Sequence, residues 1–184
     1  RELGSGWPIL LLSPVLPGEE AKLFELGLIP TVSTKEEVDR LNRAAEARGR
    51  TLDIHLKVDT GAKRQGVAVD EIAGLCRRAA GHGLEVVGLA SHFANIEDTI
   101  EHDFARLQLD RFEHAVEVAV TALGGRPAFI HTACSAASLL FRETDFNLVR
   151  IGISTYGHWP SRETQLSWIL QHGRSALGLR PALT

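Results

Sequence analysis

The sequence predicts an α/β fold, a partial TIM (β/α)8 barrel, from three observations. Short apolar runs alternate with longer amphipathic patterns along the chain, which is typical of a parallel sheet covered by helices. Polar residues gather at the ends of several runs, the place where barrels build their sites. No Gly-x-Gly-x-x-Gly follows any run, which disfavours the other candidate architecture, a doubly wound dinucleotide-binding sheet.

Six apolar segments account for the predicted strands. A finished barrel needs eight strands and about 250 residues, whereas this chain has 184 residues. We therefore expect about six of the eight β/α units, strands 3 to 8, and an internal piece of a longer protein. The lack of any methionine supports the same expectation. The predicted strands cover residues 8–12, 28–32, 52–59, 84–90, 128–132 and 148–151.

The helical patterns between these strands have recognisable starts. A Pro-Gly-Glu-Glu run at 17–20 predicts one helix start, and the Ser-Thr-Lys-Glu run at 33–36 fits a capping box that opens a second helix, which ends near Gly49. Another helix is predicted over 69–81. The longest is predicted from about 102 to 123, because apolar residues recur there at steps of four and three. They are Ala105, Leu109, Phe112, Val116, Ala119 and Leu123.

Composition and charge exclude several classes of protein. Lys and Arg number 20 and Asp and Glu 23, a formal net charge of −3, so no basic excess is available for binding nucleic acid. No apolar run reaches the roughly 18–20 residues of a membrane span, and no secretory signal is visible. Two cysteines, Cys76 and Cys134, make no disulfide framework, which favours a cytoplasmic location.

Three polar residues share one face of the third predicted strand. His55, Lys57 and Asp59 alternate with apolar neighbours, so a period of two places all three on one side. Charged groups that point into a barrel are costly unless they are paired, which makes this group a candidate site. Two plainer interpretations stay open: a structural Lys57–Asp59 pair, and a strand-exit turn over 59–61.

Two further histidines, His92 and His131, fall at or near the ends of later strands. A lone histidine is more often a hydrogen-bonded packing residue than a ligand, but several that converge on one mouth favour a site. With His55 and Asp59 they have the ligand types of zinc, which keeps a metal-dependent barrel hydrolase, with Lys57 carboxylated, as an alternative. No His-x-His pair occurs at an early strand end, and we expect no metal.

A phosphate site is predicted where the last two strands end. Residues 135–138, Ser-Ala-Ala-Ser, follow a strand and open a helix, and residues 150–153, Arg-Ile-Gly-Ile, end the final strand. Small residues at a helix start leave backbone amides open for a phosphate, and the loops after strands 7 and 8 carry that site in barrels. The alternative is that these small residues serve close packing alone.

Several short motifs occur in a fixed order along the chain. The most specific is Lys-Val-Asp-Thr-Gly at 57–61, with Arg64 behind it. The others are Pro-Thr-Val-Ser at 30–33, Ser-His-Phe-Ala at 91–94, Ala-Cys-Ser-Ala-Ala at 133–137, Val-Arg-Ile-Gly at 149–152 and Leu-Arg-Pro-Ala-Leu-Thr at 179–184. In this order they resemble the barrel domain of the alanine racemase family. The resemblance implies a fold-type III enzyme that uses pyridoxal 5′-phosphate (PLP) and interconverts L- and D-alanine, which supplies D-alanine as a peptidoglycan precursor.

The resemblance assigns cofactor-binding roles residue by residue. Arg150 matches the arginine that hydrogen-bonds the PLP ring nitrogen, and Arg64 matches the arginine near the phenolic oxygen. Three residues match contacts to the phosphate, and a fourth stands beside them where many members have Asn. They are Ser135, Gly152 and Ile153, and Cys134.

Two supporting roles also follow from the resemblance. His92 resembles the histidine that orients Arg150. Lys57 matches a position that is N-carboxylated in some members, where the resulting anion holds the arginine equivalent to Arg64. The same modification here is a hypothesis motivated by the repulsion between Lys57 and Arg64.

The resemblance implies a two-base racemisation through a PLP aldimine, with a lysine on one face of the Cα carbanion and a tyrosine on the other. In the family these bases lie before residue 1 and after residue 184. We therefore expect a partial PLP-binding barrel over 1–178, the start of a β domain at 179–184, and a chain that is inactive alone. The full-length protein is expected to be a homodimer acting on alanine. A non-catalytic PLP-binding protein stays open as a further alternative.

Overall fold

The computed structural model of the chain describes residues 6–80 and 83–173. Its strands form one parallel sheet in the order β1-β2-β3-β5-β6, with the short β4 paired to β3. The strands are β1 Ile9–Leu11, β2 Leu28–Val32, β3 Leu52–Asp59, β4 Val67–Ala68, β5 Leu84–Ala90 and β6 Phe129–His131. The helices are α1 Glu20–Leu26, α2 Lys35–Glu46, α3 Ile72–Ala79, α4 Asp103–Leu123, α5 Ser135–Leu140 and α6 Arg162–His172, with the 3₁₀ turns η1 Val69–Glu71, η2 Arg142–Thr144 and η3 Ile153–Tyr156.

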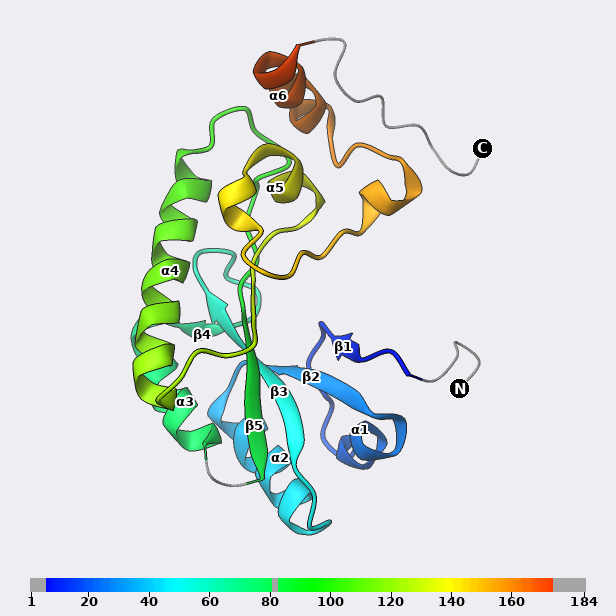
Figure 1. The fold of residues 1–184 in the computed structure, drawn as a ribbon, viewed down its shortest axis with the longest axis vertical. Helices are drawn as coiled ribbons and strands as arrows, with labels where there is room; N and C mark the ends of the chain where they lie inside the picture. Colours follow the sequence, from blue (N-terminus) through cyan, green and yellow to red (C-terminus); the bar gives the residue numbers. More distant parts are fainter. Residues whose placement is uncertain (1–5, 81–82, 174–184) are drawn as a thin grey trace.

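The strands form a curled half-barrel whose helices α2, α3 and α4 lie along one side (Figure 1). The prediction of alternating parallel strands and helices is confirmed for five of its six strands and for the helix over 102–123. The domain start predicted at 179–184 lies outside the described residues. No helix in the described part of the chain is long and apolar enough to cross a bilayer.

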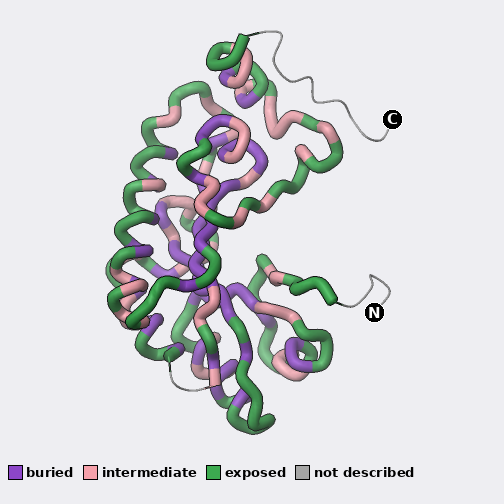
Figure 2. The backbone as a smooth tube through the Cα atoms, viewed as in Figure 1, coloured by how far each residue is buried: buried purple, intermediate pink, exposed green. Residues whose placement is uncertain are grey.

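The core lies between the central strands and the helices that cover them, where the backbone in Figure 2 is buried. Leu56 of β3, Leu89 of β5 and Phe112 of α4 are each 0% exposed. Complete burial of a side chain of this size stabilises a fold by about 1.5–3 kcal/mol. The periodicity of α4 is confirmed, since its predicted apolar residues are buried or partly buried: four pack against this core, and Ala105 and Leu109 pack in a second cluster with Phe93 and Ile96.

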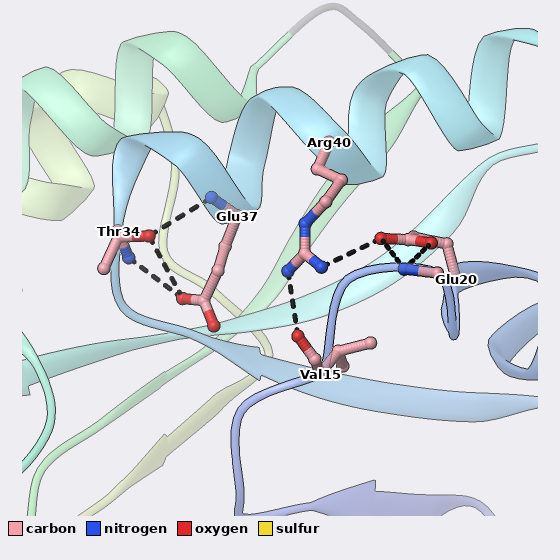
Figure 3. Close-up of polar contacts among 6 residues, drawn as sticks. Val15, Glu20, Thr34, Glu37 and Arg40 are labelled. Atoms are coloured by element: carbon pink, nitrogen blue, oxygen red, sulfur yellow. Dashed lines mark hydrogen bonds and ion pairs between the residues drawn. The ribbon is translucent and has the colours of Figure 1, made fainter.

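The capping box that opens α2 lies one residue later than the sequence pattern suggested (Figure 3). Thr34, not Ser33, is the N-cap, and its hydroxyl accepts the backbone N–H of Glu37 at 3.1 Å. The Glu37 carboxylate in turn accepts the N–H groups of Ser33 and Thr34. Because the Glu37 carboxylate accepts hydrogen bonds from both backbone amides, Thr34 is the N-cap and α2 begins at Lys35. Figure 3 also shows Arg40 of α2 joined to Glu20 and to the carbonyl of Val15, which ties α2 to α1.

The prediction of a strand at 148–151 is wrong. The Asn147 side chain takes the hydrogen bonds that a neighbouring strand would make: its Oδ1 accepts from Ile130 at 2.8 Å and its Nδ2 donates to Ala128 at 2.7 Å. The preceding Phe146 has a φ of 46°, which turns the chain out of extended geometry. The segment is therefore irregular, yet the Arg150 N–H still donates to the Ala133 carbonyl at 3.0 Å.

Replacing the cap tests this account of α2. Thr34→Ala removes the hydroxyl that accepts from Glu37, so the free energy of unfolding in urea should fall by about 1 kcal/mol. Thr121→Ala on the exposed face of α4 is the matched control, and it should stay within about 0.5 kcal/mol of the parent. Equal effects of the two substitutions would contradict the cap assignment.

Candidate functional site

One cavity of about 660 Å³ opens at the carboxyl ends of the strands. Side chains and backbone from β3, the β3–β4 loop, the ends of β5 and β6 and the segment after α5 line it together. His55, Asp59 and His131, which the strand pattern also made candidates, are not among its lining residues. Every residue to which the family resemblance assigns a role is among them, although these chemical roles stay predictions. They are Lys57, Arg64, His92, Cys134, Ser135, Arg150, Gly152 and Ile153.

Arg150 is the most strongly anchored side chain in this cavity. Its Nη2 donates to the carbonyls of Ser91 at 2.8 Å and Thr132 at 3.0 Å, and to Nδ1 of His92 at 3.3 Å. Its Nη1 donates to Nδ1 of His131 at 2.5 Å. Among the described residues its Nε–H has no protein partner, which leaves a donor for a ligand.

The partners of Arg150 fix the protonation of the histidines. Arginine cannot accept a hydrogen bond, so Nδ1 of His131 must be unprotonated and Nε2 must carry the proton. Nε2 then donates to Nδ1 of His55 at 2.7 Å. Burial, reinforced by the charge of Arg150, lowers the pKa of His131 to about 3 and that of His55 to about 4. Both imidazoles are therefore neutral near pH 7.

His55 reaches this position because of two local features. A register shift between Ile54 and His55 pairs His55 with Gly88 of β5. A Cβ on Gly88 would lie 2.3 Å from Nδ1 of His55, so only glycine leaves room for the ring. The role of His131 as a bridge between Arg150 and His55 was missed by the sequence reasoning. Gly88, inside an otherwise bulky strand, is the signal that could have indicated it.

His92 also accepts a hydrogen bond from Arg150, through Nδ1. Because arginine can only donate, this nitrogen is unprotonated and the imidazole is neutral. Burial, followed by the charge of Arg150, lowers the pKa of His92 to about 4. The histidines that the hydrolase alternative needs as ligands thus surround a cation, which repels a metal ion. The described residues contain no group of three His, Cys, Asp or Glu side chains that could hold a metal.

The segments that follow β6 and α5 meet at the predicted phosphate end. The Gly152 N–H donates to the Ser135 hydroxyl at 3.1 Å, which joins the start of α5 to the start of η3. The Ser135 hydroxyl proton stays available to a ligand. Cys134 lies beside it, and burial raises the pKa of its thiol, so the thiol is protonated and uncharged.

The opposite wall of the cavity is built by the β3–β4 loop. The Asp59 carboxylate accepts the N–H groups of Gly61 at 2.8 Å and Lys63 at 3.1 Å, so the turn interpretation is correct. Lys57 donates to Oε1 of Gln65 at 3.4 Å. Burial, then the charges of Arg150 and Arg64, lower the pKa of Lys57 to about 8. The negative charge of Asp59 opposes this lowering of the Lys57 pKa. Gln65 was not among the predicted site residues.

A parallel half-barrel with a cation-rich cavity at its strand ends defines the class of protein, a barrel domain whose main cavity lies at the carboxyl edge of the sheet. The chain belongs to the alanine racemase family: residues 1–160 match the family model for the N-terminal domain of alanine racemase. It is 38% identical over 164 residues to the alanine racemase of Desulfovibrio desulfuricans, a match that covers 89% of this chain and 44% of that relative.

Solved structures show the same architecture. The alanine racemase of Clostridium difficile 630 superposes with a TM-score of 0.85 at 24% identity, covering 97% of this chain and 47% of that one. The alanine racemase from Bartonella henselae with covalently bound pyridoxal phosphate gives a TM-score of 0.76 at 23% identity, with the same coverage. At these identities the likeness establishes the fold, a partial barrel as predicted. The chain spans less than half the length of these relatives.

The neutral histidines predict how stability depends on pH. In the unfolded chain, His55 and His131 take up protons below the ordinary histidine pKa of 6.5. In the folded chain they take up protons only near their lowered pKa values, about 4 for His55 and about 3 for His131. The stabilisation is therefore complete above pH 6.5 and declines as the pH falls, toward about 4 for His55 and about 3 for His131.

His131→Gln should flatten this decline, since the amide can accept from Arg150 and donate to His55 without taking up a proton. Urea unfolding at a series of pH values measures how the free energy of unfolding changes with pH. His114→Gln, on the exposed face of α4, is the control and should keep the full slope. The assignment fails if both variants lose stability with acid as steeply as the parent.

Proposed function

We propose that the cavity binds PLP and that the chain is the cofactor-holding part of an alanine racemase. The observation that carries the proposal is the fixed Arg150 guanidinium with neutral His131 and His92 around it, in one cavity with Ser135 and Gly152. PLP, when bound, supplies an electron sink that makes the α-proton of an amino acid acidic. The covalently bound pyridoxal phosphate of the Bartonella henselae relative supports the same ligand.

The cavity residues fit this cofactor at both ends. The cofactor phosphate would lie against the Ser135 hydroxyl and the backbone amides near Gly152 and Ile153, since small residues leave these donors open. The unpartnered Nε–H of Arg150 would face the ring nitrogen. Arg64, which lines the cavity but is solvent-exposed, would lie near the phenolic oxygen. Cys134 would contact the cofactor as a neutral thiol.

Arg150 determines the type of reaction that the site favours. A guanidinium donates hydrogen bonds and keeps its proton, so a ring nitrogen that faces it must accept and stays unprotonated. The ring then withdraws electrons less strongly than it would opposite an aspartate, which favours simple proton exchange over side reactions. His92 and His131 hold the guanidinium in place and cannot supply a competing proton, because both are neutral.

The biological setting is part of the proposal. We propose alanine as the substrate, D-alanine for peptidoglycan as the product, a cytoplasmic location and a homodimer in the full-length protein. The family membership of the chain supports each of these. The histidine contacts to Arg150 disfavour the metal-dependent hydrolase.

Cofactor binding is tested by titrating the purified chain with PLP and following absorbance. Arg150→Ala should weaken binding about ten-fold or more, because it removes a hydrogen bond from a charged group. Ser135→Ala should weaken PLP binding but leave the affinity for pyridoxal, which lacks the phosphate, unchanged. Arg162→Ala, on exposed α6, is the control and should bind normally. Equal PLP affinity in all three variants would exclude this cavity as the site.

Racemisation by the purified chain is a separate test. Among the described residues that line the cavity, Lys57 is the lysine and none is a tyrosine. With Lys57 held by Gln65, we propose that the two proton-transferring groups come from outside this set. The PLP-loaded chain should therefore leave the optical rotation of L-alanine unchanged. A steady loss of optical rotation would contradict the assignment of the bases.

A further inference from the structure

A chain of buried side-chain hydrogen bonds joins α4, which runs along the side of the sheet in Figure 1, to the strand ends that form the cavity. It consists of Gln108 of α4, Thr60 of the β3–β4 loop and Ser91 directly after β5, which are 0%, 2% and 1% exposed. None of the three is among the residues that line the cavity. A buried polar network whose members are all hydrogen-bonded makes the segments that it joins rigid.

The two ends of the Gln108 amide contact two different loops. Its Oε1 accepts the backbone N–H of Ala94 at 3.1 Å, in the segment that carries His92. Its Nε2 donates to the Thr60 hydroxyl at 3.5 Å, in the loop that carries Arg64. Because a backbone N–H can only donate, the amide oxygen faces Ala94 and the amide nitrogen faces Thr60. One side chain of α4 thus holds both loops.

The hydrogen bonds beyond Gln108 run in one direction. The Ser91 hydroxyl donates to the Val58 carbonyl at 2.9 Å, which uses its single proton. The Thr60 hydroxyl lies 2.9 Å from the Ser91 hydroxyl and must therefore donate to it. With its own proton used, the Thr60 hydroxyl accepts from Gln108. Each group in the order Gln108, Thr60, Ser91 thus donates to the next, and the series ends on the Val58 carbonyl.

Ser91 connects this series to the cavity. Its carbonyl accepts from Nη2 of Arg150 at 2.8 Å, and its N–H donates to the His131 carbonyl at 3.1 Å. The hydroxyl, the N–H and the carbonyl of Ser91 are all hydrogen-bonded, which fixes the carbonyl that anchors Arg150. A guanidinium that is held in place before a ligand arrives lowers the conformational-entropy cost of binding.

The β3–β4 loop lies directly against α4 at the same point. Gly61 has a φ of 148°, and a Cβ there would lie 2.8 Å from the Phe104 ring and 3.3 Å from Nε2 of Gln108. Arg111, on the next turn of α4, donates from Nη1 to the Thr60 carbonyl at 3.0 Å. The loop is therefore held through both the side chain and the backbone of Thr60.

We propose that Gln108 is a positioning residue of the cofactor site, which acts on Arg150 through Thr60 and Ser91. The inference rests on the proposed function, because the ring nitrogen of the bound cofactor is the group that the fixed guanidinium would face. Loss of the Gln108 amide removes the donor to Thr60 and loosens the Ser91 segment. The guanidinium then occupies more positions and hydrogen-bonds the ring nitrogen less well. The proposed phosphate end, at Ser135, does not depend on Gln108.

Solvent exchange of the Arg150 side-chain protons, followed by NMR in the chain without ligand, tests this link independently of the cofactor. Gln108→Met keeps the size of the side chain but removes both hydrogen bonds, so it should quicken exchange of the Nη protons about five-fold, the effect of one hydrogen bond. Thr60→Val should do the same, whereas Thr60→Ser keeps the hydroxyl and should exchange like the parent. Asn42→Leu, which removes a buried amide from α2, is the matched control and should leave the exchange unchanged.

A pair of cofactor analogues gives a readout that a loss of stability alone would not change. PLP and 1-deaza-PLP, in which a C–H group replaces the ring nitrogen, share the phosphate, the aldehyde and the phenol. The parent chain should bind PLP about ten-fold more tightly, the effect of a hydrogen bond from a charged group. Gln108→Met and Thr60→Val should reduce this preference about five-fold by weakening the binding of PLP alone. Thr60→Ser and Asn42→Leu should keep the full preference.

The outcomes separate the inference from the proposed function. If the parent chain binds neither ligand, the proposed cofactor site fails, and the exchange rates still decide whether Gln108 holds Arg150. If the parent prefers PLP while Gln108→Met and Thr60→Val keep both that preference and the parent's exchange rates, the site stands and the inference is overturned. If Gln108→Met does not fold, the comparison of Thr60→Val with Thr60→Ser decides in the same way.

Discussion

The hydrogen bonds of the Arg150 guanidinium are the constraint on which the rest of the site depends. Through the carbonyls of Ser91 and Thr132 this one side chain joins the ends of β5 and β6. Through His131 it reaches His55 on β3. Burial lowers the pKa of the guanidinium, and the two carbonyl dipoles offset part of the cost of removing its charge from water. The arginine is therefore both a structural tie and the charge that organises the cavity.

The same charge determines the state of its neighbours. A neutral imidazole can accept from arginine, whereas a protonated one would add a second positive charge at hydrogen-bond distance. The order Arg150, His131, His55 thus has one consistent direction of hydrogen bonding, from the guanidinium toward the interior of the sheet. The proposed anionic ligand fits a cavity with donors facing it and neutral groups behind them.

Much of the site could be predicted because it depends on backbone periodicity. The strand ends that carry Lys57, His92 and Ser135 follow from apolar runs, and the parallel sheet brings such ends to one edge. The predicted strand at 148–151 failed because a side-chain amide, that of Asn147, replaced the strand's own hydrogen bonds. Residue patterns do not distinguish these two ways of pairing.

The contacts between side chains could not be predicted for a different reason. His55 meets His131 only because the register shifts within β3 and because Gly88 leaves space, and neither feature has a periodic signal. Gln65 reaches Lys57 because the loop folds back tightly at Gly66, where the turn depends on a three-dimensional close approach. Sequence reasoning thus located the cavity and most of its lining, while the roles of His131 and Gln65 required the structure.

The protonation of the bound cofactor's ring nitrogen tests the central role of Arg150 most directly. PLP labelled with an NMR-active isotope at that nitrogen, bound to the purified chain, reports the protonation through its chemical shift. A permanently charged guanidinium opposite the nitrogen predicts the shift of an unprotonated pyridine, unchanged as the pH is lowered through the range in which free PLP takes up its ring proton. A pyridinium shift in the complex would contradict the account.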